Sequence, residues 1–311
     1  MTALSVRGVT RRFGDLTAVD HVSFDVGPGE ILGFIGPNGA GKTTTMRICA
    51  TLELPDEGDV LVDGLSVLSH AREARHRLGF MPDSYGAYVH TTISEYLDFF
   101  ARAYGLRGRE RTRMLDHVKD FTGLRPLEEK LITSLSKGMK QRLCLAKTLL
   151  HDPAILILDE PAAGLDPHAR VELRELVKAL AELGKAIMIS SHILSELSQI
   201  CTTAAVIEAG KLRATGSIED IVRGVQAQRT GVYLRALAPL EELQRALLEE
   251  PGVSGVRQHR AGLLVELEGQ EEAQSRLLRS LVSRGLDVVE FTPKSADLEE
   301  VFLSLTRGQV Q

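Results

Sequence analysis

The sequence predicts an α/β fold with a mostly parallel β-sheet, followed by a smaller α+β domain. Short apolar runs over residues 31–35, 154–158 and 186–189 alternate with segments whose apolar residues recur at helical spacing, a pattern typical of buried parallel strands joined by helices. A stretch of helical patterns alone interrupts this alternation, and a second series of strands and helices begins near residue 220. The length of 311 residues also corresponds to about two domains.

The N-terminal part is expected to form an antiparallel subdomain beside the main sheet. Apolar and polar residues alternate over 4–7 and 22–26, as they do in strands with one buried face. A Gly-Pro-Gly turn then leads into the run at 31–35. Residues 60–62 and 77–81 are expected to be two further strands.

A helical insertion is predicted over about residues 91–150. Thr92 and Glu95 fit a capping box, in which two side chains satisfy each other's backbone N–H groups at a helix start. Strand character then returns, and Asp166 followed by Pro167 marks the start of the next helix. The insertion is therefore placed inside the α/β frame.

The elements after residue 220 predict a ferredoxin-like domain with the order β-α-β-β-α-β. The expected strands are 232–236, 253–257, 263–267 and 286–291, and the expected helices are 239–248, 271–284 and a short last helix at 298–305. We expect one domain over residues 1–220, with the insertion inside it, and an accessory domain over 221–311.

Composition excludes several classes of protein. The net charge of −5 gives no basic footprint for nucleic acid. Cys49, Cys144 and Cys201 lie far apart, as expected of reduced thiols in a cytoplasmic protein and not of a disulfide or zinc framework. No apolar run approaches the ~20 residues that cross a bilayer, and the first residues lack the pattern of a signal peptide. Any membrane-spanning part is therefore expected from another subunit.

A phosphate-binding loop follows the apolar run at 31–35. It matches the pattern G-x-x-x-x-G-K-[ST] completely, and a helical pattern over 43–52 follows it. Backbone N–H groups of such a loop crowd around a polyphosphate, with Lys42 expected on the β- and γ-phosphates and Thr43 on Mg²⁺. The loop residues are Gly36, Pro37, Asn38, Gly39, Ala40, Gly41, Lys42, Thr43 and Thr44.

Two adjacent carboxylates, Asp159 and Glu160, follow the apolar run at 154–158. Ligands of a parallel sheet bind at the carboxyl ends of its strands. We expect Asp159 to hold Mg²⁺, directly or through water, and Glu160 to polarise the attacking water as general base. The alternative is a strand that ends in a solvated Asp-Glu turn.

Further motifs resemble those of ABC-type ATPases, a family of P-loop NTPases. Residues 135–142, with the sequence LSKGMKQR, resemble the family's signature segment. Residues 163–166 resemble its D-loop, and 190–192 resemble the segment that carries its switch histidine. Phe13 lies where the family has an aromatic residue that stacks on adenine. The resemblance covers roughly residues 4–218.

The resemblance implies that two ATPase domains pack head to tail with ATP between them. Ser136 and Gly138, at the start of a helix expected over 139–150, would contact the γ-phosphate of the nucleotide held by the second subunit. His192 would hydrogen-bond the γ-phosphate and help Glu160 to hold the water. A homodimer is expected, with ATP and Mg²⁺ as cofactors.

Two departures from the family pattern stand out. Lys137 and Met139 replace a glycine and a glutamine of the signature segment; Lys137 either adds charge at the interface or is a solvated lysine. Asp83 occupies a position where the family normally has glutamine. Asp83 either retains a role on Mg²⁺ or only couples the nucleotide site to a partner. We list Asp83 with Thr43 and Asp159 as metal ligands.

The function that the resemblance implies is an ATP-hydrolysing subunit that powers a membrane transporter. It would be cytoplasmic, held at the inner face of the cell membrane by a separate permease that docks on residues 83–89 and the insertion. The tail at 295–303 resembles that of exporter ATPases for drugs, antibiotics or polysaccharides. The alternative is a non-transport ABC-type ATPase that acts on the ribosome or DNA, but such proteins carry tandem motifs or a long coiled coil, and neither is present.

The role of the C-terminal domain stays open at this point. It either binds a regulatory ligand or partner, or it packs and contributes a dimer contact. His259 stands alone there, without a pattern of metal ligands or catalytic residues around it.

Overall fold

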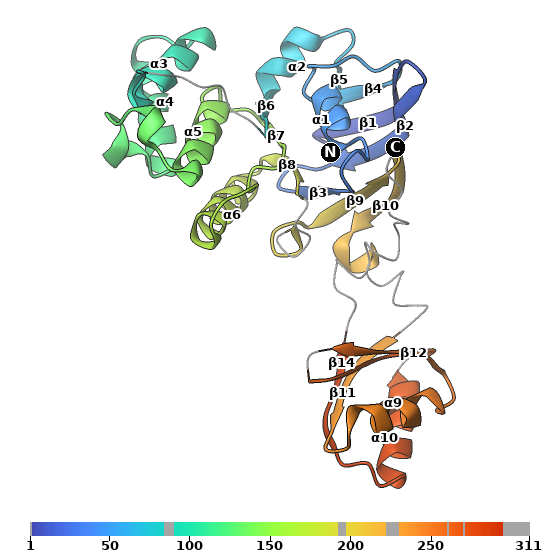
Figure 1. The fold of residues 1–311 in the computed structure, drawn as a ribbon. Coiled ribbons are helices and arrows are strands. Elements are labelled where there is room, and N and C mark those ends of the chain that lie inside the picture. The colour runs from blue at the N-terminus through green and yellow to red at the C-terminus, as the bar shows by residue number, and fades with distance from the viewer. Residues whose placement is uncertain are drawn as a thin grey trace. The chain divides into compact units, whose positions relative to one another are not determined.

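The computed structural model describes residues 2–83, 90–191, 197–221, 230–259, 261–269 and 271–294 (Figure 1). The chain divides into two compact units, and the boundary between them falls after Ser217 in the sequence. The first unit contains the phosphate loop and the carboxylates, and the second contains the C-terminal strands and helices.

The main sheet of the first unit is formed by six of the described strands in the order β10-β9-β3-β8-β7-β6. From β9 to β6 all neighbouring strands are parallel, and β10 pairs antiparallel to β9. Every residue of the central strands β3, β8 and β7 is buried, which explains their continuous apolar runs. The strands are β3 (Ile31–Ile35), β6 (Leu78–Met81), β7 (Ile155–Leu158), β8 (Ala186–Ser190), β9 (Thr203–Glu208) and β10 (Lys211–Ser217).

A second, antiparallel sheet has the order β2-β1-β4-β5. Its strands are β1 (Leu4–Phe13), β2 (Leu16–Val26), β4 (Glu57–Val62) and β5 (Leu65–Ser66). One buried cluster joins it to helix α1 (Lys42–Cys49) and the main sheet. The cluster includes Val6 of β1, Met46 of α1 and Phe34 of β3. The predicted antiparallel N-terminal subdomain is this sheet.

Two local predictions need correction here. Arg77, expected at the start of a strand, ends helix α2 (Ala71–Arg77), and the strand β6 begins at Leu78. The sequence gives little signal for α2 because Ala74 is its one buried residue. The helix after the phosphate loop, expected to run to residue 52, ends at Cys49.

The helical insertion contains α3 (Ile93–Ala103), α4 (Gly108–Phe121) and α5 (Lys137–Leu149), with short 3₁₀ turns at Arg125–Leu127 and Ile132–Ser134. The capping box at the start of α3 is formed: Glu95 N–H donates to Thr92 Oγ1, and Thr92 N–H donates to Glu95 Oε2. Near the end of α5, Thr148 Oγ1 donates to the Cys144 carbonyl and lies 3.5 Å from the Phe80 carbonyl of β6.

Helix α6 (Pro167–Glu182) follows the carboxylates. The Asp166 side chain accepts a 2.9 Å hydrogen bond from Ala169 N–H, and Pro167 occupies the first helical position, where no backbone N–H is needed. Gly184 stands just after the helix with a φ of 88°, the left-handed conformation that ends many helices.

The second unit has the predicted order: β11 (Thr230–Ala236), α9 (Leu240–Leu248), β12 (Val253–His259), β13 (Gly262–Leu267), α10 (Glu271–Ser283) and β14 (Val288–Lys294). The strand order β12-β13-β11-β14, with all pairs antiparallel, is that of a ferredoxin-like sheet. Both helices pack on the same core as the strands, through Leu247 of α9 and Leu281 of α10. The helix expected at 298–305 lies outside the described residues.

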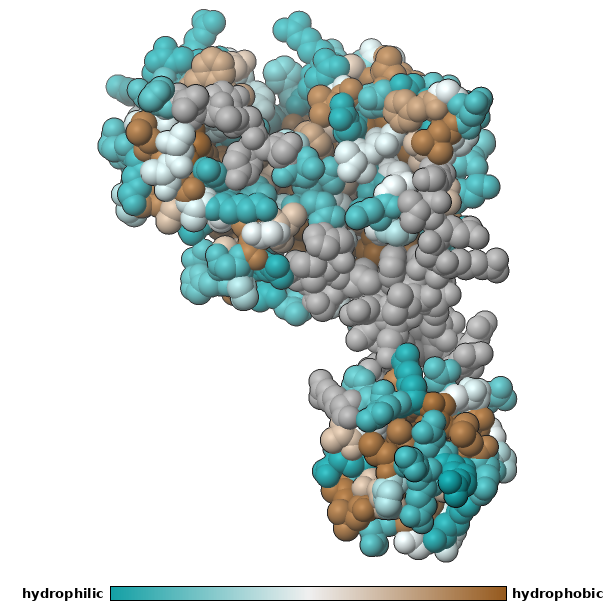
Figure 2. Space-filling view, viewed as in Figure 1, coloured by the Kyte–Doolittle hydropathy of each residue, from teal (hydrophilic) through white to brown (hydrophobic). Residues whose placement is uncertain are grey.

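The visible face of the second unit mixes hydrophilic and hydrophobic residues (Figure 2). Its exposed large apolar side chains include Leu237, Leu248, Val282 and Val289. The two roles predicted for this unit, binding of a regulatory ligand or partner and a packing and dimer contact, stay predictions.

Candidate functional site

The phosphate loop is held by backbone from two other strands. A Cβ added at Gly36 would overlap the carbonyl oxygen of Ile207 in β9, and one added at Gly41 would overlap the carbonyl oxygen of Ala18 in β2. Gly41 also has a φ of 99° and is the N-cap of α1, so no side chain caps this helix. The loop therefore needs glycine at both positions. The N-terminus of α1, which follows the loop, carries the partial positive charge that suits an anion.

Lys42 is folded back into the loop. Its side chain is buried, with 7% of the residue exposed, and Nζ donates to the carbonyls of Gly36 at 2.7 Å and Pro37 at 3.0 Å. Burial lowers the pKa of Lys42, while the negative charges of Glu160 and Asp159 act in the opposite direction. A buried cation held by the loop's own carbonyls fits a polyphosphate, whose negative charges would add to those of Glu160 and Asp159.

Asp159 lies at the carboxyl end of β7 and is 2% exposed. Its N–H donates to the Met81 carbonyl of β6 at 2.9 Å. Burial raises the pKa of Asp159, hydrogen bonds from Ser190 and Thr43 oppose this shift, and the charges of Asp83 and Glu160 raise it further. The structure thus brings the three predicted metal ligands, Thr43, Asp83 and Asp159, to one end of the sheet.

The side chains around Asp159 fit a Mg²⁺ ion that is coordinated partly by the protein and partly by a nucleotide, not one enclosed by protein ligands alone. Among the residues that the structure describes, no group of three or more His, Cys, Asp or Glu side chains could hold a metal. A hydroxyl and one or two carboxylates leave positions for phosphate oxygens and water, which is how Mg²⁺ is held beside nucleotides.

Glu160 has a backbone φ of 48°, a left-handed conformation that is uncommon outside glycine. Its N–H donates to Ser190 Oγ at 2.8 Å, and Ser190 Oγ donates to Asp159 Oδ1 at 2.7 Å. Ser190 ends β8 and is fully buried. One hydroxyl therefore contacts both carboxylate residues. A strained backbone such as that of Glu160 is common at functional sites.

Sequence reasoning assigned no role to Ser190. The signal that could have found it is a serine at the end of an apolar strand, two residues before the predicted His192. His192 itself lies outside the described residues, so its predicted role stays a prediction.

Phe13 ends β1 and is 46% exposed, with the Arg11 guanidinium 4.8 Å from its ring centroid. It pairs with Leu16 of β2, two residues from Ala18, whose carbonyl borders Gly41. This register places the end of the β1–β2 hairpin beside the phosphate loop. An exposed ring there is available to stack on a base.

The signature segment lies in the helical insertion, apart from the phosphate loop of the same chain (Figure 1). Ser136 is the N-cap of α5 and its Oγ accepts a 3.3 Å hydrogen bond from Met139 N–H. Gly138, expected just before the helix, lies in its first turn because α5 begins at Lys137. A Cβ at Gly138 would lie 2.8 Å from Ala169 Cβ of α6.

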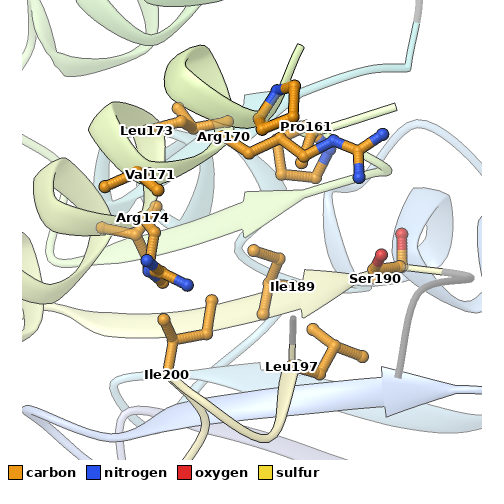
Figure 3. Close-up of a pocket in the computed structure, with 13 residues that line it drawn as sticks. Pro161, Arg170, Val171, Leu173, Arg174, Ile189, Ser190, Leu197 and Ile200 are labelled. Atoms are coloured by element: carbon orange, nitrogen blue, oxygen red, sulfur yellow. The ribbon is translucent and has the colours of Figure 1, made fainter. Parts of the chain in front are cut away.

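A mostly apolar cavity of about 220 Å³ lies between α6 and the end of β8 (Figure 3), and its lining includes Pro161, the residue after Glu160. Arg170 and Arg174 of α6 reach along one side of it, and Ile189, Leu197 and Ile200 line the other. Ser190 also lines it, so the cavity adjoins the carboxylate pair and not the phosphate loop.

In the described part of the chain, no helix is long and apolar enough to pass through a membrane.

Comparison with known proteins identifies both units. The family described as "ABC transporter" matches residues 19–163, and "ATP-binding protein DrrA1-3-like, C-terminal domain" matches 216–306. The chain is 32% identical over 309 residues to Nod factor export ATP-binding protein I of Ralstonia nicotianae, which covers 99% of this chain and 95% of that protein.

Two further matches agree with this. The probable multidrug ABC transporter ATP-binding protein YbhF of Escherichia coli is 37% identical over 220 residues, which is 71% of this chain but only 38% of that protein. A solved ATP-binding subunit of an ABC transporter superposes with a TM-score of 0.66 at 30% identity, covering 72% of this chain and 94% of that one. The predicted family and fold class are confirmed, and the chain belongs to the family of ABC transporter ATP-binding proteins.

Proposed function

We propose that this chain hydrolyses ATP and thereby powers an exporter whose membrane-spanning part is a separate permease. The observation that carries the proposal is the hydrogen-bonded set of Asp159, Ser190 and Glu160. The negative charges of Asp159 and Glu160 raise the pKa of the buried Lys42 in the phosphate loop. The names of the relatives, a multidrug transporter and a Nod factor export protein, agree with an exporter ATPase. None of the relatives described here favours the ribosome or DNA class.

The chemistry follows from the residues in place. The loop backbone from Gly36 to Thr44 and the Lys42 ammonium would bind the phosphates, and Phe13 would stack on the base. Mg²⁺, held by Thr43, Asp159 and Asp83, would offset phosphate charge. Glu160 would accept a proton from the attacking water, and the buried Ser190 keeps its backbone in position.

A second copy of the chain would complete the site. Ser136 and Gly138 lie at the start of α5, apart from their own phosphate loop, so they would meet a nucleotide only across an interface. The N-terminal end of α5 offers backbone donors there. We therefore propose a head-to-tail homodimer, with His192 as a further γ-phosphate contact.

The test separates binding from hydrolysis. Glu160→Gln should lower the rate of ATP hydrolysis by about 10²–10⁴-fold while ATP affinity stays unchanged, because the general base is lost and the phosphate loop is not. Glu182→Gln, an exposed residue at the end of α6, is the matched control and should hydrolyse ATP normally. Near-normal turnover by Glu160→Gln would exclude Glu160 as the base.

A second variant tests the phosphate loop. Lys42→Ala removes a charged donor worth about 1.5–3 kcal/mol, so ATP should bind roughly tenfold more weakly or worse. Unchanged affinity in equilibrium binding would count against the phosphate-loop assignment.

A third variant tests the metal assignment. Asp83→Asn keeps the size of the side chain and removes its charge, so the Mg²⁺ concentration that gives half-maximal activity should rise if Asp83 is a ligand. An unchanged Mg²⁺ requirement would exclude Asp83 as a ligand and favour the alternative in which it only couples the nucleotide site to a partner.

The partner is tested with the same trapped form. Tagged Glu160→Gln protein, extracted gently from its native cells with ATP, should bring down a polytopic membrane protein in near-equal amount. We expect this protein to be the permease that holds the chain at the inner face of the membrane. Ribosomal or DNA-associated partners without a membrane protein would instead favour the non-transport alternative.

A further inference from the structure

The cavity between α6 and the end of β8 has an apolar wall that carries two arginines (Figure 3). Leu173 and Val177 of α6 line it together with Ile189 of β8 and, further along the chain, Leu197 and Ile200. None of its described lining residues is acidic. Its volume of about 220 Å³ exceeds the roughly 150 Å³ of an apolar protein cavity that binds benzene. The cavity therefore has room for an aromatic ring that carries a short side chain.

Arg170 and Arg174 give this wall a positive charge. They stand four residues apart on α6, so they lie on one face of the helix, where like charges repel each other. Arg174 Nε is buried and has no hydrogen-bond partner among the described residues. Glu175 Oε1 lies 3.7 Å from it, on a side chain that is 61% exposed. An anion inside the cavity would reduce the repulsion and offer Arg174 the acceptor that it lacks.

The remaining contact of the Arg174 guanidinium is with a neutral group. Its Nη1 donates to Oε1 of Gln199, an exposed side chain. An amide oxygen is a single uncharged acceptor, whereas a carboxylate can accept two parallel hydrogen bonds from one guanidinium. The apolar wall and the two arginines together favour a molecule with an apolar body and a carboxylate.

The same cavity borders the residues that hold the proposed general base. Ser190, which accepts the N–H of Glu160 and donates to Asp159, lines the cavity, and so does Pro161, which follows Glu160 in the chain. None of the described lining residues belongs to the phosphate loop. An occupant would therefore press on the backbone beside Glu160 without entering the place where the phosphates bind.

We propose that this cavity binds a small aromatic carboxylate, with its ring against Leu173 and Ile189 and its carboxylate on Arg174. Bound there, the ligand lowers the rate of ATP hydrolysis and leaves ATP affinity unchanged, because a small displacement of a general base is enough to slow a reaction. The regulatory part of this inference rests on the proposed function. The binding part does not.

The experiment titrates cinnamate into the full-length protein by calorimetry. Saturating ADP is present, so that the nucleotide site is filled and cannot take up the probe. We expect one cinnamate per chain with a Kd below about 1 mM. Cinnamamide has the same ring and side chain without the charge, so it should bind roughly tenfold more weakly.

One pair of variants tests the charge. Arg174→Met keeps an apolar stem and removes the guanidinium, so cinnamate should bind about tenfold more weakly and lose its advantage over cinnamamide. Gln199→Ala removes the neutral partner of Arg174 but leaves the cation, and should bind cinnamate as the unchanged protein does. Arg279→Met, at an exposed arginine of α10, is the control for loss of a positive charge elsewhere.

A second pair tests the volume. Val171 lines the cavity and is 46% exposed, so Val171→Trp can place its larger ring at the edge of the cavity without entering the core. It should weaken the binding of cinnamate and cinnamamide alike. Val282→Trp, at a valine of α10 that is 59% exposed, is the matched control and should bind both as before.

The regulatory part is measured as the rate of hydrolysis against ATP concentration. Saturating cinnamate should lower kcat severalfold and leave KM for ATP unchanged. The same concentration should have a much smaller effect on Arg174→Met, because this variant binds the probe weakly. Gln199→Ala should be inhibited as the unchanged protein is.

The site is excluded if the unchanged protein shows no saturable binding below about 1 mM, if cinnamate and cinnamamide bind equally, or if Arg174→Met binds cinnamate normally. Normal binding of both probes to Val171→Trp would place them outside the cavity. A bound probe that leaves kcat unchanged, or that raises KM for ATP, would contradict the regulatory part. Failure of the proposed function looks different: ATP is not hydrolysed with or without the probe, while cinnamate still binds and Arg174→Met still weakens it.

Discussion

The hydroxyl of Ser190 donates a 2.7 Å hydrogen bond to Oδ1 of Asp159, between the ends of the neighbouring strands β8 and β7. Ser190 Oγ also accepts a hydrogen bond from the N–H of Glu160. Asp159 is almost fully buried, so Ser190 stabilises its charged form at a place where burial favours the neutral one. The two carboxylate residues with different proposed tasks thus depend on one buried side chain.

Ser190→Ala should reduce both stability and activity. The substitution leaves the Glu160 N–H and one Asp159 oxygen without their partner, which costs about 1–3 kcal/mol in the free energy of unfolding. It also raises the pKa of Asp159 further, so the acidic limb of the pH–rate profile of ATP hydrolysis should shift to higher pH. Urea unfolding and a pH–rate profile measure the two effects.

Ser134→Ala is the control for Ser190→Ala. Ser134 Oγ donates to the Leu131 carbonyl in an exposed 3₁₀ turn, so its loss should change stability by less than about 0.5 kcal/mol. An unchanged pH–rate profile in Ser190→Ala would contradict the proposed effect on Asp159.

Gly36→Ala should disrupt the phosphate loop. Its Cβ would overlap the Ile207 carbonyl of β9, so the loop or the strand must move. We expect a loss of about 1–3 kcal/mol in stability and clearly weaker ATP binding, measured by urea unfolding and equilibrium titration. Gly64→Ala, at a turn with a φ of 79° and open space, should cost stability without weakening ATP binding. Normal ATP affinity in Gly36→Ala would show that the loop tolerates the displacement.

The pair Gly138 and Ala169 allows packing to be separated from nucleotide contact. Gly138→Ala brings two Cβ atoms to 2.8 Å and should destabilise the junction of α5 and α6. Adding Ala169→Gly removes the clash and should restore the free energy of unfolding. If ATP hydrolysis returns as well, Gly138 is needed for packing; if only stability returns, Gly138 is needed where the γ-phosphate binds. No recovery of stability would contradict the assigned clash.

His151 should make stability depend on pH. Its Nε2–H donates to the Leu78 carbonyl at 2.8 Å, while Nδ1 is buried and has no hydrogen-bond partner among the described residues. Burial lowers the pKa of the ring below its usual 6.5. As pH falls below 6.5, the unfolded chain takes up a proton that the folded protein refuses until its lower pKa is reached. The stabilisation by neutral His151 is therefore complete above pH 6.5, and it is lost as the pH falls from 6.5 through the lower pKa of the folded protein.

The measurement is the fall in the free energy of unfolding between pH 7.5 and pH 5. It should be smaller in His151→Gln, whose amide can still donate to the Leu78 carbonyl, than in the unchanged protein. His117→Gln, which replaces an exposed histidine, should leave the pH dependence as it was. An equal fall in His151→Gln and the unchanged protein would exclude this role.

Much of the fold was predictable because its signals are local. The apolar run of β7, the capping box at Thr92 and Glu95, and the Asp166-Pro167 helix start each act within a few residues, so the local sequence specifies them. The helix α2 escaped prediction because only Ala74 is buried, which leaves no apolar stripe to detect.

The sequence alone also placed the phosphate loop and the Asp159–Glu160 pair at strand ends, because each motif is continuous along the chain. It could not show that Ser190 joins the two carboxylate residues, nor that Lys137 lies over Gly164. These contacts join residues 27 to 31 positions apart. They exist because β7 and β8 are neighbours in the sheet and because α5 and α6 pack closely, and such arrangements arise only when the whole core assembles.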